Sequence, residues 1–199
     1  MSTLQTVKGV RVNCIGDREK CHRPQYEPIE IPITDPIFSE RERTTSDITD
    51  RIGIPLFTWK CPPSPVWANS KEASSDGTGF ASSSEAAALH LSCNTNEQPD
   101  MMNKFGFGFT PGSFLAVRQD RKPLKPLHME ALCRYCRDYV LPLFSHHLGE
   151  YAPDEPLSQE AVLGMICRPT FSIFFYERFE EDVRARGGGY VALSPLYGA

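Results

Sequence analysis

The stretch FGFGFTPGSFLAVRQDRKPLKP, residues 105–126, marks the point at which the chain changes from strand-like to helical sequence. In its first part phenylalanine alternates with glycine, so the three rings share one face of an extended strand. A Pro-Gly turn dipeptide follows at 111–112, and β-forming residues return at 113–119. This order predicts a β-hairpin that pairs part of 104–109 with 113–119.

Beyond this stretch, apolar residues recur at helical spacing. Pro126 suits the first turn of a helix, Pro142 should kink or end that helix, and Ser158 is a favourable N-cap for the next. A last helix carries a stripe of phenylalanines and should end at the glycines of 187–189. We expect six helical residues to be buried together against the strand at 113–119, namely Leu132, Cys133, Cys136, Phe171, Phe174 and Phe175.

Residues 1–40 are predicted to be an extended or partly disordered N-terminal arm. Prolines recur at every fourth position from Pro24 to Pro36, a spacing that excludes both a helix and a central strand. If the arm is ordered, it lies extended over the domain surface. Three isoleucines are then its candidate anchors: Ile29, Ile31 and Ile33.

The strand-like runs precede the helical ones rather than alternating with them, which indicates an α+β fold. We expect a small irregular antiparallel sheet packed against C-terminal helices, in a single domain that covers 41–186. The low-complexity stretch at 69–84 predicts a flexible loop within this domain, and 187–199 is predicted to be a C-terminal tail.

Length and composition restrict the class of protein further. A chain of 199 residues corresponds to one domain with tails, and its net charge of −4 argues against general nucleic-acid binding. No apolar run is long enough for a signal peptide or a membrane span. We therefore expect a cytoplasmic or nuclear protein whose seven cysteines are reduced thiols.

Cys133 and Cys136 form a CxxC pair, a spacing that occurs in zinc sites and redox pairs. His146 and His147 are the candidate partner ligands. In a continuous helix, His147 would lie about 16 Å beyond Cys136, whereas zinc ligands lie within about 2.3 Å of the metal. We therefore predict two core cysteines with no metal and no cofactor. A zinc site is the alternative, and it requires the chain to reverse its direction near Pro142.

A cluster of basic residues precedes the first predicted helix. Such side chains, together with the N–H groups at the start of a helix, can hold a phosphate or a carboxylate. Asp120 lies in the middle of this turn, so a turn that is charged only for solvation is the alternative. The candidate anion-binding residues are Arg118, Arg121, Lys122 and Lys125.

Several segments resemble intracellular proteins of filamentous fungi for which no activity is established. The resemblance extends over residues 40–186 and implies a shared lineage and a shared domain, but no reaction. It is carried by RTTSDI at 43–48, CPPSPVW at 61–67, RQDRKPL at 118–124, HMEALCRYC at 128–136, EYAP at 150–153 and MICRP at 165–169.

No catalytic motif stands out, so the functional expectation rests on the general character of the chain. We expect a non-enzymatic domain that binds another protein, because its proline-rich segment is suited to an extended contact. The alternative is a small enzyme or accessory protein of fungal specialised-metabolite biosynthesis. In that case the phenylalanines from Phe105 to Phe179 would line an apolar pocket.

Overall fold

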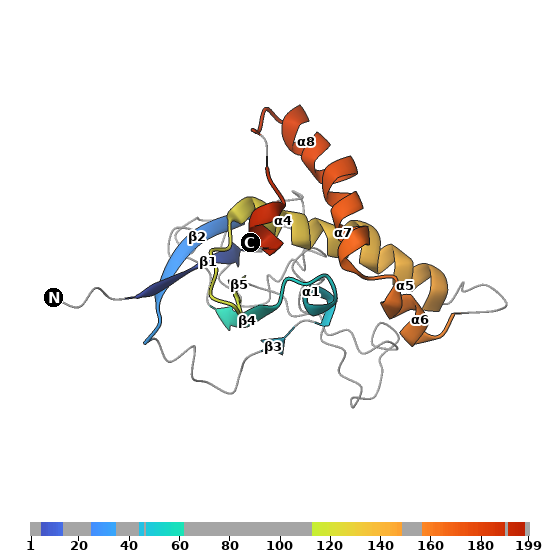
Figure 1. The fold of residues 1–199 in the computed structure, drawn as a ribbon, viewed down its shortest axis with the longest axis horizontal. Helices are drawn as coiled ribbons and strands as arrows, with labels where there is room; N and C mark the ends of the chain where they lie inside the picture. The colour runs from blue at the N-terminus through green and yellow to red at the C-terminus, as the bar shows by residue number, and fades with distance from the viewer. Residues whose placement is uncertain are drawn as a thin grey trace, which may run out of the picture.

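The computed structural model describes residues 5–13, 25–34, 44–45, 47–61, 113–148, 157–189 and 191–197. In Figure 1 the strands lie to the left and centre, and two long helices cross each other on the right. The second long helix rises away from the sheet, so that its last part lies at the top of the view. This arrangement of one sheet and a separate group of helices confirms the α+β fold class.

In the part of the chain that the structure describes, five strands form one sheet in the order β2-β1-β5-β4-β3, and all of its pairs are antiparallel. The strands are β1 (Thr6–Asn13), β2 (Gln25–Pro32), β3 (Thr44–Thr45), β4 (Leu56–Cys61) and β5 (Ser113–Arg118). Residues 113–118 of the predicted hairpin form β5, but β5 pairs with β1 on one edge and β4 on the other, so the predicted hairpin pairing is corrected. The first half, at 104–112, lies outside the described residues.

Strand β2 carries two of the regularly spaced prolines at one edge of the sheet. The Ile33 N–H donates to the Gln5 carbonyl at 2.9 Å, so odd-numbered residues of β2 form hydrogen bonds with β1. Pro28 and Pro32 are even-numbered, and the N–H that each one lacks would face the open edge. An edge strand therefore tolerates the four-residue proline spacing. Strands β1 and β2 share one sheet with β4 and β5, so the described part of 1–40 pairs with residues of the predicted domain.

The helices in the described residues form two long rods and three short segments. The first rod consists of α4 (Pro126–Tyr135), the π-helical turn η2 (Cys136–Val140) and α5 (Leu141–Leu148). The second consists of α7 (Arg168–Phe174), the π-helical turn η3 (Phe175–Phe179) and α8 (Glu180–Ala185). The short segments are α1 (Asp47–Arg51), α6 (Gln159–Gly164) and α9 (Ser194–Tyr197).

The first rod continues through Pro142, so of the two predicted effects of this proline, a kink or an end, the end does not occur. The wider turn η2 ends two residues before the proline, and the Leu141 N–H reaches back to the Cys136 carbonyl. Proline lacks an N–H and crowds the carbonyl four residues earlier, and a local π-helical turn relieves both problems.

Glycine ends the second rod, as predicted. Gly187 has φ of 78°, in the left-handed region that glycine enters without strain. Its N–H donates to the Arg184 carbonyl at 2.9 Å, and the Gly188 N–H donates to the Val183 carbonyl at 2.8 Å. This pair of bonds is a Schellman motif.

The two faces of the sheet pack against different apolar clusters. One face contributes Phe114 and Ala116 to the main core, together with the six helical residues predicted to be buried there, and this prediction is confirmed. The opposite face forms a smaller cluster around Leu115 and Val117. The three predicted isoleucine anchors belong to this second cluster, namely Ile29, Ile31 and Ile33.

Gly9 lies at a point where β1 and β5 approach too closely for a side chain. A Cβ atom here would lie 2.5 Å from the Val117 Cγ1 atom and 2.6 Å from the Ala116 carbonyl oxygen. We expect Gly9→Ala to lower the free energy of unfolding by about 1–3 kcal/mol, because the backbone must move. Gly164→Ala is the matched control, since a Cβ at Gly164 meets nothing within 4 Å. Equal urea midpoints for both variants would contradict the close approach.

Candidate functional site

Arg118, the first residue of the predicted anion cluster, forms hydrogen bonds with other groups of the protein. Only 3% of it is exposed, at the end of β5. Its Nε and Nη2 atoms donate to the Asp120 carboxylate at 2.8 and 2.6 Å, and its Nη1 atom donates to the Leu196 carbonyl. The hydrogen bond from Arg118 holds the pKa of Asp120 below its ordinary value. The donors of Arg118 are therefore used within the protein, and its predicted anion-binding role is not tested by the structure.

The other three cations of the predicted cluster are exposed on the turn that leads into α4. Arg121 has φ of 59°, and its N–H donates a hydrogen bond of 3.0 Å to the Arg118 carbonyl, which closes the turn. The Lys122 N–H donates to the Asp120 Oδ1 atom at 3.2 Å. Lys125 is the residue before the first turn of α4. The Asp120 carboxylate thus accepts hydrogen bonds from both ends of this turn. The anion-binding role of the three exposed cations stays a prediction.

The CxxC pair lies in the core of the first rod. Cys133 and Cys136 are both buried, and burial raises the pKa of the Cys136 thiol to about 12. His146 and His147 lie beyond η2, with 4.7 Å between their own ring centroids. Across the described residues, no three His, Cys, Asp or Glu side chains gather in a way that would hold a metal ion. The structure thus does not bring the four candidate zinc ligands together.

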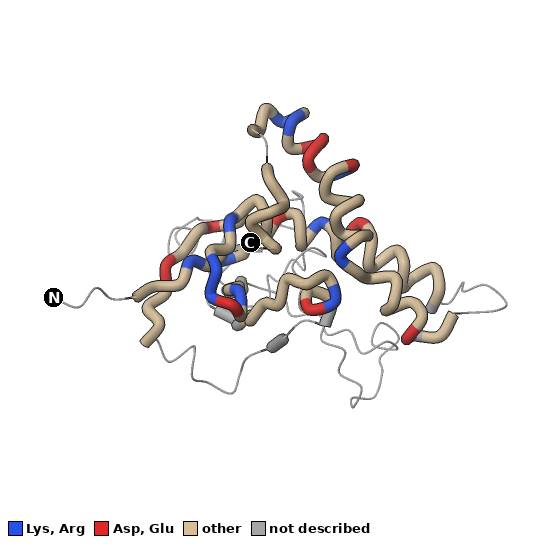
Figure 2. Tube along the Cα trace, in the orientation of Figure 1, with Lys and Arg blue, Asp and Glu red and all other residues tan. Residues whose placement is uncertain are grey.

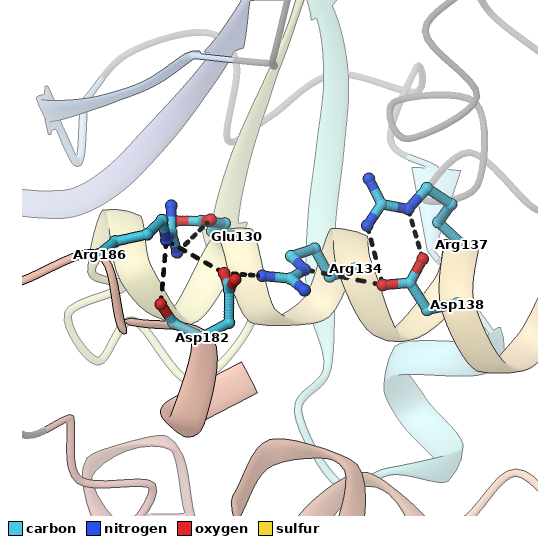
Figure 3. Close-up of polar contacts among 6 residues, drawn as sticks. All are labelled: Glu130, Arg134, Arg137, Asp138, Asp182 and Arg186. Carbon is cyan, nitrogen blue, oxygen red and sulfur yellow. Dashed lines mark hydrogen bonds and ion pairs between the residues drawn. The ribbon is translucent and has the colours of Figure 1, made fainter. Parts of the chain in front are cut away.

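A network of ion pairs joins the two rods where they meet (Figure 3). Arg134 of α4 contacts the Asp182 carboxylate of α8 at 2.5 Å, and Arg186 contacts the Glu130 carboxylate at 2.9 Å. The network is completed within η2 by Arg137 and Asp138. Its three guanidinium groups and three carboxylates balance one another. We therefore interpret it as a clamp between α4 and α8 and not as a ligand site.

The surface of the second rod changes character along its length. Figure 2 shows charged residues along α8, acidic in its first turn and basic in its last, whereas 169–176 contains no charged residue. Within this uncharged run, Ile173 is 55% exposed and Tyr176 is 46% exposed. Large apolar side chains that are adjacent and exposed are typical of contact surfaces, whereas isolated ones are common on any protein.

Tyr197 of α9 lies close to Tyr176 and to Arg168 of α7. The Arg168 guanidinium carbon lies 3.7 Å from the centroid of the Tyr197 ring, in a cation–π contact. Burial raises the pKa of the Tyr197 hydroxyl to about 12 despite the nearby charge of Arg168. Tyr176 also acts on this hydroxyl electrostatically, so the two tyrosines are neighbours. We call the surface formed by Arg168, Ile173, Tyr176 and Tyr197 the α7 face.

The sequence contained a signal for the α7 face that the prediction did not use. The predicted apolar stripe was defined by phenylalanines, and these are buried. Ile173 and Tyr176 lie off that stripe, and an apolar residue outside the buried stripe of a helix is a candidate for exposure. The contribution of Tyr197 had no local signal, because it depends on where α9 packs.

Comparisons with known proteins identify no relative of this chain. No protein-family model matches it, and neither a curated protein nor a solved structure matches it. The helices in the described part of the chain are all too short or too polar to span a membrane. The function is therefore argued from the chain's own residues.

Proposed function

We propose that this chain is a non-enzymatic protein-binding domain whose partner docks on the α7 face. The exposure of Ile173 and Tyr176, side by side on an uncharged stretch of helix, is the observation that carries the proposal. Tyrosine and arginine are over-represented among the residues that contribute most to protein interfaces, and both border this patch. The partner is a protein with an apolar surface of its own, which would cover the two side chains.

The open edge of β2 is a poorer docking surface than the α7 face. A partner strand that adds to a sheet edge needs a regular row of N–H donors. Pro28 and Pro32 remove two of the outward-facing donors of β2. Prolines on an edge strand are a common device against such pairing. The helical surface therefore supports the proposal better than the sheet edge.

The alternative function, an enzyme or accessory protein of fungal metabolism, needs its aromatic residues to line a pocket. The described phenylalanines of the second rod pack against one another instead. Ring centroids of Phe171 and Phe175 are 6.2 Å apart, and those of Phe175 and Phe179 are 5.3 Å apart. All three rings are fully buried. Because these aromatic side chains fill the core and do not line a pocket, they support a protein-binding domain over an enzyme or accessory protein.

The proposal is tested by capture from an extract of the cells that express the chain. Tagged wild-type protein is compared with an Ile173→Ser, Tyr176→Ser double variant and with Leu127→Ser. Leu127 is a suitable control because it is an exposed apolar residue at the start of α4, outside the α7 face. A protein captured by the wild type and by the control is then purified for direct binding measurements.

We expect the double variant to bind this purified partner at least tenfold more weakly than wild type, because truncating a central interface residue costs about 2 kcal/mol or more. The control should bind with unchanged affinity. All three proteins should unfold at similar temperatures, since the substituted side chains are exposed. Equal affinity of the double variant and the wild type would contradict the proposed docking surface.

A further inference from the structure

The segment at 120–125, here called the basic turn, lies between β5 and α4 and presents positive charge to solvent. Its exposed cations are Arg121, Lys122 and Lys125. Within the described part of the chain none of these three forms an ion pair, and both oxygens of the local Asp120 carboxylate already accept from Arg118. Figure 2 shows basic residues gathered along this segment. A chain with a net charge of −4 thus carries a local surface of three uncompensated positive charges.

Hydrogen bonds within the protein hold the basic turn in one shape. The Leu124 N–H donates to the Lys8 carbonyl of β1 at 3.1 Å, and the Leu124 side chain is buried. The Lys122 N–H donates to the Asp120 Oδ1 atom at 3.2 Å. The cations therefore extend from an ordered backbone, so a ligand need not order the turn when it binds.

Two of the three cations occupy positions at which the backbone favours a different residue. Arg121 has φ of 59°, in the left-handed region that glycine and asparagine enter more readily than arginine. Lys125 is the N-cap residue of α4, and its side chain forms no capping hydrogen bond. Aspartate, asparagine, serine and threonine are the residues favoured at that position. The first turn of α4 also lacks an acidic residue that would offset the positive end of the helix dipole.

This arrangement lowers the stability of the chain alone and would be relieved by an anion. Three like charges on one short turn repel one another, and an anion placed between them replaces that repulsion with attraction. Residues that depart from the local preference of the backbone are expected where a protein gives up stability for function. The charge of the basic turn is therefore better explained by binding than by folding.

The form of this surface restricts the class of anion. Its side chains are exposed and spread along the turn, which suits an extended partner with several negative charges better than a single small ion. A nucleic acid or an anionic membrane would also approach the rest of the chain, whose net charge of −4 repels it. A short acidic segment of a protein can contact the basic turn alone.

We propose that the basic turn is a docking surface for an acidic segment of a partner protein, in which several aspartate or glutamate side chains follow one another. The basic turn shares no residue with the α7 face, so this inference does not rest on the function proposed for that face. Because the contact is between exposed charges, its affinity falls as salt screens them.

The test uses the purified full chain and a fluorescein-labelled oligoglutamate peptide, whose anisotropy is measured at low and at high ionic strength. We expect wild type to bind this peptide at low ionic strength and much more weakly at high ionic strength. A labelled peptide of alternating glycine and serine should not bind. Phosphatidylserine vesicles and a short RNA are measured under the same conditions, and tighter binding of either one than of oligoglutamate would overturn the assignment to an acidic protein segment.

Two variants separate binding from folding. Lys125→Asp should bind oligoglutamate at least about fivefold more weakly at low ionic strength, because it replaces an attraction with a repulsion. Its melting temperature should nevertheless rise by about 2–4 °C, since aspartate can cap α4. Arg121→Gly should also bind more weakly without unfolding at a lower temperature. Arg178→Glu is the matched control, because it makes the same change in net charge as Lys125→Asp at an exposed position of η3.

The control should bind oligoglutamate like the wild type. A wild type that does not bind oligoglutamate, or a Lys125→Asp variant that binds it equally well, would overturn the proposal. The same holds if Arg178→Glu loses as much affinity as Lys125→Asp, since binding would then depend only on overall charge. A lower melting temperature of Lys125→Asp would show that the lysine stabilises the fold, which also contradicts the inference.

Discussion

Phe174→Ala is expected to lower the free energy of unfolding by about 3–5 kcal/mol, the range for truncating a phenylalanine in a packed core. Phe174 is 4% exposed and lies where α7 packs against α4. Its ring centroid is 5.4 Å from that of Tyr135, at an interplanar angle of 65°. Alanine would remove this edge-to-face contact and leave a cavity between the two rods.

Ile173→Ala is the matched control for this prediction, because Ile173 is the preceding residue of the same helix and is largely exposed. We expect its effect to be within about 0.5 kcal/mol. The two variants are compared by urea denaturation, with the slope of the transition checked for two-state behaviour. If Phe174→Ala costs no more than Ile173→Ala, the packing of the two rods described here is incorrect.

Arg118→Ala is expected to lower the free energy of unfolding by about 2–3 kcal/mol, because it leaves the buried Leu196 carbonyl without its donor. The loss of the Asp120 ion pair adds little, since this carboxylate is partly exposed and regains water. Arg121→Ala, on the exposed part of the same turn, should change stability by less than about 0.5 kcal/mol.

The pH dependence provides a second measurement for Arg118. The hydrogen bond from Arg118 lowers the pKa of Asp120 below 3.8. The contribution of the Arg118–Asp120 pair to stability is therefore present at neutral pH and is lost as the pH falls below that value. The difference in the free energy of unfolding between wild type and Arg118→Ala should therefore become smaller at strongly acidic pH. A difference that grows on acidification, or an Arg121→Ala variant as unstable as Arg118→Ala, would argue against this assignment.

Much of the fold was predictable because the relevant signals are local. The apolar spacing of Leu132, Cys133 and Cys136 predicted a buried helical face, and the glycines at 187–189 predicted the end of the second rod. Local patterns were less informative for polar residues. Glu180 is charged, which favours exposure, yet it is buried and paired with Arg184 at 2.6 Å. A pairing of this kind allows a charged side chain to be buried.

The candidate site was only partly predictable, because charge in a sequence does not show where a side chain points. Arg118 and Arg121 occur in the same basic turn, but Arg118 ends a central strand and donates to the Leu196 carbonyl of α9. Arg121 lies past the strand and remains in solvent. The predicted cluster therefore divides into one structural arginine and three exposed cations.

By itself, the sequence determined which elements form and which faces of them are apolar, because hydrophobic periodicity, proline spacing and glycine positions act within a few residues. Only the tertiary structure decided which strands became neighbours and where α9 docks. Those contacts join residues far apart in the chain, such as Arg118 with Leu196 and Arg168 with Tyr197. The free energy of such contacts depends on shape and burial that arise only once the core has formed, so no local pattern encodes them.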